Sequence, residues 1–196
     1  MLETQIPVQT VEKVIGLEVV DSTNNVAKEL AEQGEAANTM VLACRQTSGR
    51  GRFERSFSAE EGGVYFTLIL RPRVYPSRNQ SFSIKAAQAV SEALNALFHI
   101  KTKIKEPNDV LAWEPNSRSW KKICGILIEA SASETKTDWM LVGIGINVNN
   151  KIPASLKDSA VSLKQLLGQD IMKEVVLEEV LEHFWRRYAE WESSVC

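Results

Sequence analysis

This chain of 196 residues has few of the residues that build metal sites or disulfide networks. It contains two histidines and three cysteines, with no CxxC pair and no HExxH sequence. A zinc site, which uses closely spaced ligands of these types, is therefore not expected. Cys44, Cys124 and Cys196 are odd in number and far apart, which predicts reduced thiols and a cytoplasmic location. Cys44 and Cys124 lie in apolar runs and are expected in the core.

Long apolar runs and targeting patterns are also missing. No uninterrupted apolar stretch reaches the ~18 residues that indicate a membrane-spanning helix. The N-terminus has no basic segment followed by an apolar one, so no signal peptide is expected. The formal net charge of -2 does not favour coating of nucleic acid. These absences predict neither a membrane nor a nucleic-acid partner.

The composition is that of an ordinary globular domain, with 44% hydrophobic and 24% charged residues. We find no internal repeat and no linker, so residues 1–196 are expected to form a single domain. Apolar periodicity predicts strands at 14–20, 40–45, 64–70, 101–105, 110–113, 122–130 and 139–147. It predicts helices at 24–33, 84–98 and 171–191, with a short helix near Leu163, while the polar span 114–121 is typical of a hairpin tip. The predicted fold class is α+β, with a mixed, mostly antiparallel sheet backed by helices on one face.

A basic glycine-containing loop dominates the polar part of the sequence. Residues 46–57 read Q-T-S-G-R-G-R-F-E-R-S-F, in a chain that is otherwise slightly acidic. Glycine allows backbone amides to approach a ligand, and arginine binds carboxylate or phosphate oxygens in pairs. The loop could simply be a solvated basic turn, but together with the motifs below it favours a site for a small anion.

Other motifs narrow the chemistry. No G-x-x-x-x-G-K-[ST] or G-x-S-x-G sequence is present, which excludes a P-loop and a nucleophile elbow. Residues 143–147, G-I-G-I-N, lack the third glycine of a dinucleotide loop, because Val148 stands there. Glycines inside a strand indicate either a bulge or room for a ligand on the sheet. D-S-T-N-N at 21–25 is explained by helix capping alone, although its hydroxyls could also face a pocket.

Two lysines flank a turn. Lys105 precedes E-P-N-D, and a hairpin could bring Lys122 back beside it. Either lysine alone would be expected to extend into water, but with Arg50 and Arg52 they suggest a site for one or two anions. Asp109 is expected to accept hydrogen bonds in the turn, to orient a lysine, or to help hold Mg²⁺ through water.

Five of these segments together resemble the catalytic domain of biotin protein ligases. They are D-S-T-N at 21–24, Q-T-S-G-R-G-R at 46–52, K-E-P-N-D at 105–109, K-I-C-G-I-L at 122–127 and G-I-G-I-N at 143–147. Each segment alone is unspecific, but they occur in the family's order, and the resemblance covers roughly residues 15–192. It implies a seven-stranded sheet akin to class II aminoacyl-tRNA synthetases. It also implies two half-reactions: biotin and MgATP give biotinoyl-5′-AMP, and the biotinoyl group then passes to one lysine of a biotin carboxyl carrier protein of a biotin-dependent carboxylase.

The resemblance also implies roles for individual residues. It assigns the catalytic cations to Lys122, Arg52 and Lys105. It assigns biotin binding to Ser22, Thr23, Asn24, Gln46, Arg50, Gly51, Arg52, Lys122, Gly125 and Gly143. It assigns ATP binding to Arg52, Phe57, Lys105 and Asn147, and an Mg²⁺ contact to Asp109.

The sequence departs from the family pattern at two positions and leaves two rival functions open. Glu106 stands where the family usually has tryptophan, and Glu54 where it usually has glycine, so each adds an acid near a site for anions. A lipoate or octanoate transferase of the same fold is one alternative, and a non-catalytic biotin-binding module is the other. No N-terminal DNA-binding segment and no C-terminal small β domain are expected. The family often forms homodimers through sheet edges, and the sequence leaves the oligomeric state open.

Overall fold

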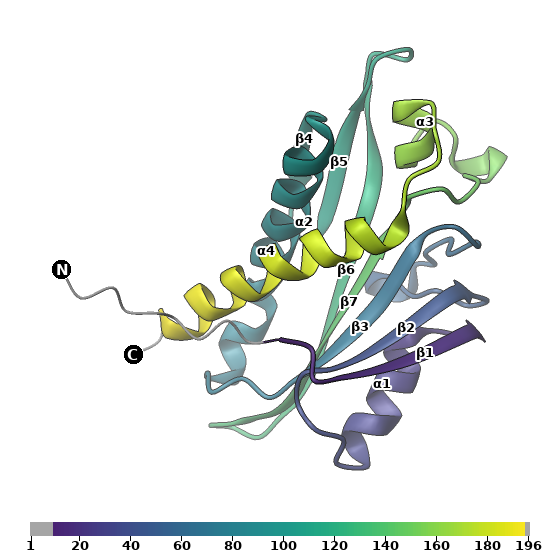
Figure 1. Ribbon diagram of the computed structural model, residues 1–196. Coiled ribbons are helices and arrows are strands. Elements are labelled where there is room, and N and C mark those ends of the chain that lie inside the picture. Colours follow the sequence, from purple (N-terminus) through teal and green to yellow (C-terminus); the bar gives the residue numbers. More distant parts are fainter. Residues whose placement is uncertain (1–9, 195–196) are drawn as a thin grey trace.

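The computed structural model describes residues 10–194, and the account below concerns these residues. Seven strands form one sheet in the order β1-β2-β3-β7-β6-β5-β4 (Figure 1). They are β1 (Lys13–Val20), β2 (Thr39–Gln46), β3 (Val64–Leu70), β4 (Thr102–Lys105), β5 (Asp109–Glu114), β6 (Ser119–Ala132) and β7 (Thr137–Ile146). Strands β1 and β2 pair in parallel, and every other neighbouring pair in this sheet is antiparallel. The predicted α+β class with a mixed, mostly antiparallel sheet is confirmed.

The helices also match the expected segments. They are α1 (Thr23–Glu32), α2 (Phe82–Phe98), α3 (Leu163–Leu167) and α4 (Lys173–Ser193), with 3-10 turns at η1 (Arg52–Glu54), η2 (Pro76–Ser81) and η3 (Ala154–Leu156). The predicted hairpin tip at 114–121 is too long. Strand pairing continues through Trp113 opposite Trp120 and Glu114 opposite Ser119, so the tip is 115–118. Two tryptophans facing each other across the strands extend the ladder beyond the polar boundary of the sequence.

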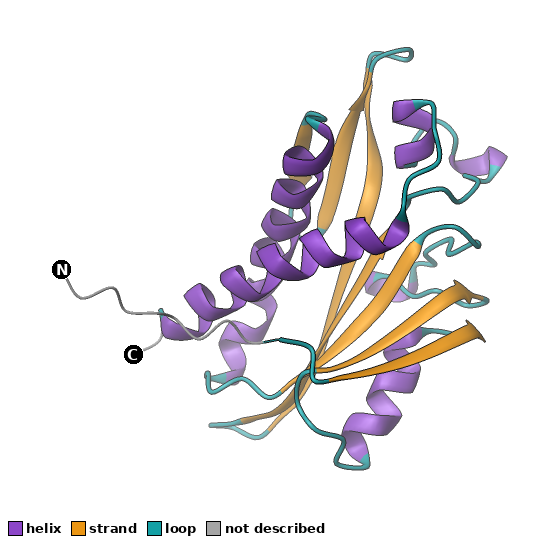
Figure 2. Cartoon of the chain, viewed as in Figure 1, coloured by secondary structure: helices purple, strands orange, loops and turns teal. Residues whose placement is uncertain are grey.

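The expectation that the helices lie on one face of the sheet is wrong for α1. Helices α2 and α4 cover one face, where they pack on side chains such as Leu68, Val142 and Ile144. Helix α1 covers the other face of the sheet (Figure 2). Its residues Ala27 and Ala31 pack on alternate positions of the same strands: Val41, Ile69, Trp139 and Leu141. All seven residues of β3 are buried, so its apolar side chains need cover on both faces.

The strand alternation decides which face can hold a ligand. In β7, Val142, Ile144 and Ile146 belong to the core under α2 and α4. Gly143 and Gly145 alternate with them and therefore face the side of α1. At these two positions the strand thus presents backbone rather than side chains on that face.

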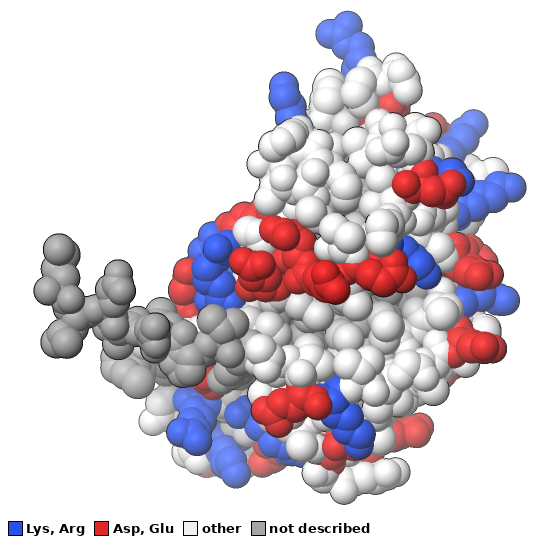
Figure 3. Space-filling model, viewed as in Figure 1, with Lys and Arg blue, Asp and Glu red and all other residues white. Residues whose placement is uncertain are grey.

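Helix α4 closes the opposite face. Its inner side places Val180, Phe184 and Tyr188 in the core, as the periodicity predicts. Its outer side is acidic, and Figure 3 shows a band of red side chains along it, formed by the exposed residues Glu174, Glu178, Glu182 and Glu190. No helix in the described part of the chain has the length and apolar character needed to cross a bilayer.

The two described cysteines differ from each other. Cys124 is fully buried, as expected, and burial raises the pKa of its thiol. Cys44 is exposed, so the prediction that it is a core residue is wrong. The pairing of β2 with β3 ends at Ala43, and Cys44 lies just beyond this covered part of the strand. Cys196 lies outside the described residues.

An ion-pair cluster joins α2 to α4. Glu92 of α2 contacts Arg187, Arg186 and His183 of α4. Burial acts to raise the pKa of the Glu92 carboxyl, but hydrogen bonds from Arg187 and His183 outweigh it and hold the pKa below its ordinary value. A carboxyl with a lowered folded-state pKa stabilises the fold above its unfolded pKa, and this contribution is lost as the pH falls through the folded-state value.

We therefore expect the stability difference between the wild type and Glu92→Gln to depend on pH. The wild type should be more stable at neutral pH, and the difference should shrink below about pH 4, near the pKa of an unperturbed glutamate. Urea unfolding of both proteins from pH 7 to pH 3 measures this. A difference that stays constant over that range would show that the charge of Glu92 does not contribute.

Candidate active site

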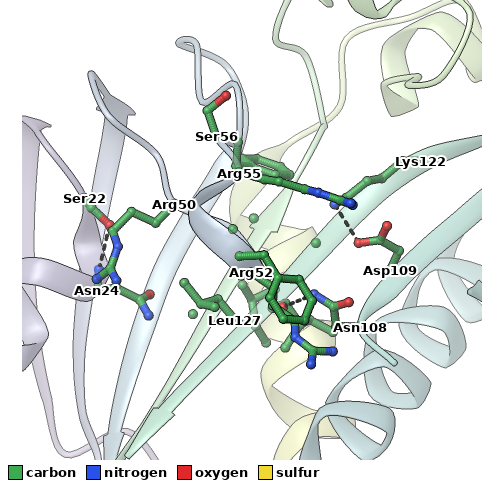
Figure 4. Close-up of a pocket in the computed structure, with 18 of the residues that line it drawn as sticks. Ser22, Asn24, Arg50, Arg52, Arg55, Ser56, Asn108, Asp109, Lys122 and Leu127 are labelled. Carbon is green, nitrogen blue, oxygen red and sulfur yellow. Dashed lines mark hydrogen bonds and ion pairs between the residues drawn. The ribbon is translucent and has the colours of Figure 1, made fainter. Parts of the chain in front are cut away.

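A cavity of about 230 Å³ lies on the α1 side of the sheet. Its walls are the start of α1, the basic loop after β2, the β4–β5 turn, and the middle of β6 and β7. Figure 4 shows its two ends: Ser22, Asn24 and Arg50 lie on one side, and Asp109 and Lys122 on the other. All residues assigned by resemblance except Asn147 line this cavity: Ser22, Thr23, Asn24, Gln46, Arg50, Gly51, Arg52, Phe57, Lys105, Asp109, Lys122, Gly125 and Gly143.

The start of α1 supplies the hydroxyl and amide groups. Ser22 is the N-cap, and its Oγ accepts a hydrogen bond from the Asn24 backbone N–H at 3.3 Å. Thr23 donates from its backbone N–H to Gln46 Oε1 at 2.8 Å and from its hydroxyl at 3.1 Å. Capping and pocket lining are therefore not alternatives here, because the same short segment does both. Since Gln46 uses its oxygen within the protein, its Nε2 can donate to a ligand.

Two side chains behind this segment were not identified from the sequence. Thr67 of β3 is fully buried, and its Oγ1 lies 2.7 Å from Asn24 Oδ1 and 2.9 Å from Thr23 Oγ1. Glu129 of β6 accepts a hydrogen bond from Asn24 Nδ2 at 2.8 Å. These contacts fix the orientation of the Asn24 amide. Only the single threonine in the apolar strand V-Y-F-T-L-I-L could have indicated Thr67.

The strand glycines make room for side chains of the site. A Cβ at Gly143 would collide with Asn24 Oδ1, and one at Gly145 would lie 2.7 Å from Cε1 of Phe57. A Cβ at Gly125 would lie 2.9 Å from Lys122 Nζ. Real Cβ atoms do not approach neighbours this closely, so side chains at these three positions would displace the residues that line the cavity.

Gly143→Ala is expected to weaken both folding and ligand binding, because the added methyl group must displace the buried Asn24 side chain from Thr67 and Glu129. The overpacking should cost about 1–3 kcal/mol of unfolding free energy. Urea unfolding and a titration with biotin, the ligand that the resemblance implies, measure the two effects. Gly16→Ala is the matched control, since no atom lies within 4 Å of a Cβ at Gly16. Equal behaviour of the two variants would contradict this account of Gly143.

The opposite end of the cavity holds a lysine–aspartate pair. Lys122 Nζ lies 2.6 Å from Asp109 Oδ1 and 5.5 Å from the centroid of the Phe57 ring. Strand β5 runs between Lys105 and Lys122: Asp109 pairs with Lys105 on one side and with Gly125 on the other. The hairpin thus brings both lysines to one cavity. Glu106, the first departure from the family pattern, also lines it.

The residues of the cavity do not form a metal cage by themselves. Within residues 10–194, no group of three or more His, Cys, Asp or Glu side chains is placed to hold an ion. Mg²⁺ is commonly bound by one or two carboxylates together with substrate phosphates. The predicted Mg²⁺ contact of Asp109 therefore fits an ion that arrives with a nucleotide, and Asp109 would have to share its carboxylate with Lys122.

The basic loop is held by few contacts. Its chain turns back on itself, with the Gly51 N–H donating to the Arg55 oxygen at 2.7 Å. Phe53, at its tip, has φ of 54° and is 80% exposed, and the Arg52 guanidinium lies 5.0 Å from its ring centroid. Arg52 forms no ion pair with the described side chains. Its charge therefore remains available for an anion.

Asn147 is placed differently from the other assigned residues. It follows β7, is buried, and its Oδ1 accepts a hydrogen bond from Asn150 Nδ2 at 3.0 Å. Its backbone N–H donates to the Ile123 oxygen at 2.8 Å. Asn147 does not line the cavity, so a nucleotide contact from this residue stays a prediction.

Three features define a class of protein: the sheet, the hydroxyl and amide groups at the start of α1, and the cationic loop. The class is an α+β domain with a site for a small molecule that carries both polar groups and a negative charge. The model of the biotin/lipoate A/B protein ligase family matches residues 16–147. The chain therefore belongs to this family.

Two relatives with known names are described as ligases. The bifunctional ligase/repressor BirA of Bacillus subtilis is 39% identical over 178 residues, which cover 89% of this chain and 53% of that protein. The biotin–[acetyl-CoA-carboxylase] ligase of Paracoccus denitrificans is 31% identical over 177 residues, covering 89% of this chain and 71% of the relative. The chain thus spans about half the length of the Bacillus subtilis relative and 71% of the Paracoccus denitrificans one.

A solved structure agrees in fold. The biotin protein ligase from Aquifex aeolicus, in complex with biotin and ATP, superposes with a TM-score of 0.78 at 34% identity, covering 93% of this chain and 72% of that one. This likeness confirms the fold that the five motifs predicted.

Proposed function

We propose that this chain activates biotin with MgATP to form biotinoyl-5′-AMP and then transfers the biotinoyl group to a lysine of a biotin carboxyl carrier protein. The observation that carries the proposal is one cavity with two different ends. Hydroxyl and amide groups at the α1 end suit the N–H and C=O groups of the ureido ring of biotin. Lys122, Arg52 and Lys105 suit a carboxylate that meets a phosphate.

In the first half-reaction, a carboxylate oxygen of biotin attacks the α-phosphorus of ATP. The bond from this phosphorus to the bridging oxygen breaks, and pyrophosphate leaves. Both reactants are negative, so the reaction needs cations placed where charge develops. Lys122 is held at the wall by Asp109 at 2.6 Å and can donate to the carboxylate and then to the phosphate. Arg52, in the loop that lines the same cavity, would add a second cation.

In the second half-reaction, the lysine amine of the carrier attacks the acyl carbon, AMP leaves, and the amine releases a proton. A mixed anhydride is reactive enough that positioning the amine supplies much of the rate. No side chain of this cavity is assigned as a dedicated base. The exposed loop 49–57 would instead protect the adenylate from water.

This protection gives a prediction for loop 49–57. The exposed arginines of the loop should be cut rapidly by trypsin in the empty protein and slowly in the presence of biotin and MgATP, because closure over the adenylate buries them. Mass spectrometry of the fragments reports cleavage at this loop. Cleavage at the same rate with and without both substrates would rule out closure.

The direct test of the function uses the chain, biotin, MgATP and a purified biotin carboxyl carrier domain. A carrier that gains the mass of one biotin, with release of pyrophosphate, is the expected result. Lipoate in place of biotin tests the alternative of the same fold, which has less support because the relatives above are named for biotin. Stoichiometric biotin binding without pyrophosphate release would instead identify a binding module. A single catalytic domain, a cytoplasmic location and a homodimer stay predictions.

A further inference from the structure

Glu129 lies behind two residues that line the cavity, Asn24 and Arg50, and neither the sequence motifs nor the proposed mechanism uses it. It stands on β6, which is paired with β7 at this point through Glu129 and Leu141. Its side chain is 24% exposed. A carboxylate fixed on a sheet strand beside a site for anions is unfavourable unless cations or hydrogen-bond donors compensate it.

Glu129 contacts both walls. Its Oε1 lies 2.9 Å from Nη2 of Arg50, and its Oε2 accepts from Nη1 of Arg50 at 3.2 Å and from Asn24 Nδ2 at 2.8 Å. The same Nη1 donates to Asn25 Oδ1 at 2.9 Å. Glu129 therefore links the start of α1 to the basic loop, and Arg50 receives a bidentate partner.

These contacts are the main polar attachment of the loop. Among the described residues, the side-chain hydrogen bonds that join loop 49–57 to the rest of the chain are those of Arg50. The other hydrogen bonds of the turn, Gly51 to Arg55, Arg55 to Arg52 and Phe57 to Gly49, stay inside the loop. A second hollow lies behind the loop, with Glu129 and Gln80 in its wall, so the loop is not packed tightly from that side.

We propose that Glu129 is a positioning residue that anchors Arg50, and through it the basic loop, at the biotin end of the cavity. It contacts no reacting atom. Its carboxylate keeps the guanidinium beside Asn24 and Asn25 and aligns the Asn24 amide for the ligand. This proposal rests on the proposed function for its ligand, but the anchoring itself is a property of the empty protein. Glu129 should consequently determine how well biotin binds and leave the chemical step beside Lys122 unaffected.

The first measurement is hydrogen–deuterium exchange of loop 49–57 in the ligand-free protein. Glu129→Gln keeps the shape and an acceptor for Asn24 but removes the charge that holds Arg50. We expect faster exchange in the loop for Glu129→Gln and for Arg50→Ala. The double variant should exchange no faster than Arg50→Ala, because both single changes break the contact between Glu129 and Arg50. Glu134→Gln is the matched control: it lies in the β6–β7 hairpin and is exposed.

The second measurement is steady-state kinetics of biotin transfer. Glu129→Gln should raise KM for biotin about tenfold, the cost of weakening one charge-assisted contact, with kcat changed less than about threefold. Glu129→Asp, which keeps the charge, should restore part of the affinity.

The outcomes separate this proposal from the proposed function. Loop exchange in Glu129→Gln equal to that of the wild type and of Glu134→Gln overturns the anchoring role, whether or not the wild type is a ligase. So does a loss confined to kcat. If the wild type transfers no biotin but the loop exchanges faster in Glu129→Gln, the anchoring stands and the ligase function fails.

Discussion

Lys122→Ala is expected to lower kcat/KM for biotin transfer by at least about 100-fold, the usual cost of removing one preorganised donor from developing negative charge. Lys122 is held at the cavity wall by its 2.6 Å contact with Asp109. Arg52 and Arg55, by comparison, belong to the exposed loop. The loss should appear in pyrophosphate release as well as in carrier mass, since the first half-reaction brings two anions together.

The controls for Lys122→Ala separate its charge from the geometry of its neighbours. Lys121→Ala removes an adjacent lysine whose Nζ bonds to the Lys157 oxygen at 2.9 Å, away from the cavity, and should change the activity by no more than about twofold. Lys122→Ala also leaves Asp109 unpaired. The double variant Lys122→Ala/Asp109→Ala should remain as inactive as the single variant. Recovery in the double variant would mean that Lys122 serves only to neutralise Asp109.

The sequence predicts most of the sheet because apolar residues in its strands are either continuous or alternate with polar residues. Neither pattern is typical of an amphipathic helix. V-Y-F-T-L-I-L at 64–70 coincides with β3, and the helix expected at 84–98 is α2 with two more residues at its start. The side of the sheet taken by α1 could not be predicted. A strand buried on both faces reads as a continuous apolar run, which carries no information on which helix covers which side.

The sequence predicts the cavity residues that belong to motifs. It does not predict the residues that act on the cavity by positioning another side chain. Ser22, Gln46, Arg50 and Lys122 come from short recognisable segments, and the structure gathers them around one cavity. Thr67 lies in a strand without any motif, and Glu129 lies two residues beyond the motif at 122–127. The roles of both residues depend on cross-strand register. The exposure of Cys44 depends on where the β2–β3 pairing ends, which apolar periodicity does not specify.

Phe82→Ala is expected to lower the free energy of unfolding by about 3–5 kcal/mol, as for other buried aromatic truncations. The Phe82 ring is fully buried at the start of α2, with ring centroids of Phe184, Tyr188 and Trp191 at 5.3, 5.4 and 4.9 Å. The residual cavity would lie between α2 and α4, whose contact closes one face of the sheet. Phe53→Ala removes the same side chain from an exposed position and should change stability by no more than about 0.5 kcal/mol.

Phe82→Ala also tests whether one face of the sheet determines stability and the other determines biotin binding. Phe82 belongs to the core under α2 and α4, whereas Gly143 and Asn24 lie on the α1 face. At a temperature at which it is still folded, Phe82→Ala should therefore keep the biotin KM of the wild type. Gly143→Ala should raise the biotin KM. Denaturant unfolding and kinetics at one low temperature give both values for each variant. A raised KM in folded Phe82→Ala would mean that the helix layer sets the geometry of the cavity through the sheet, and that stability and binding share one set of contacts.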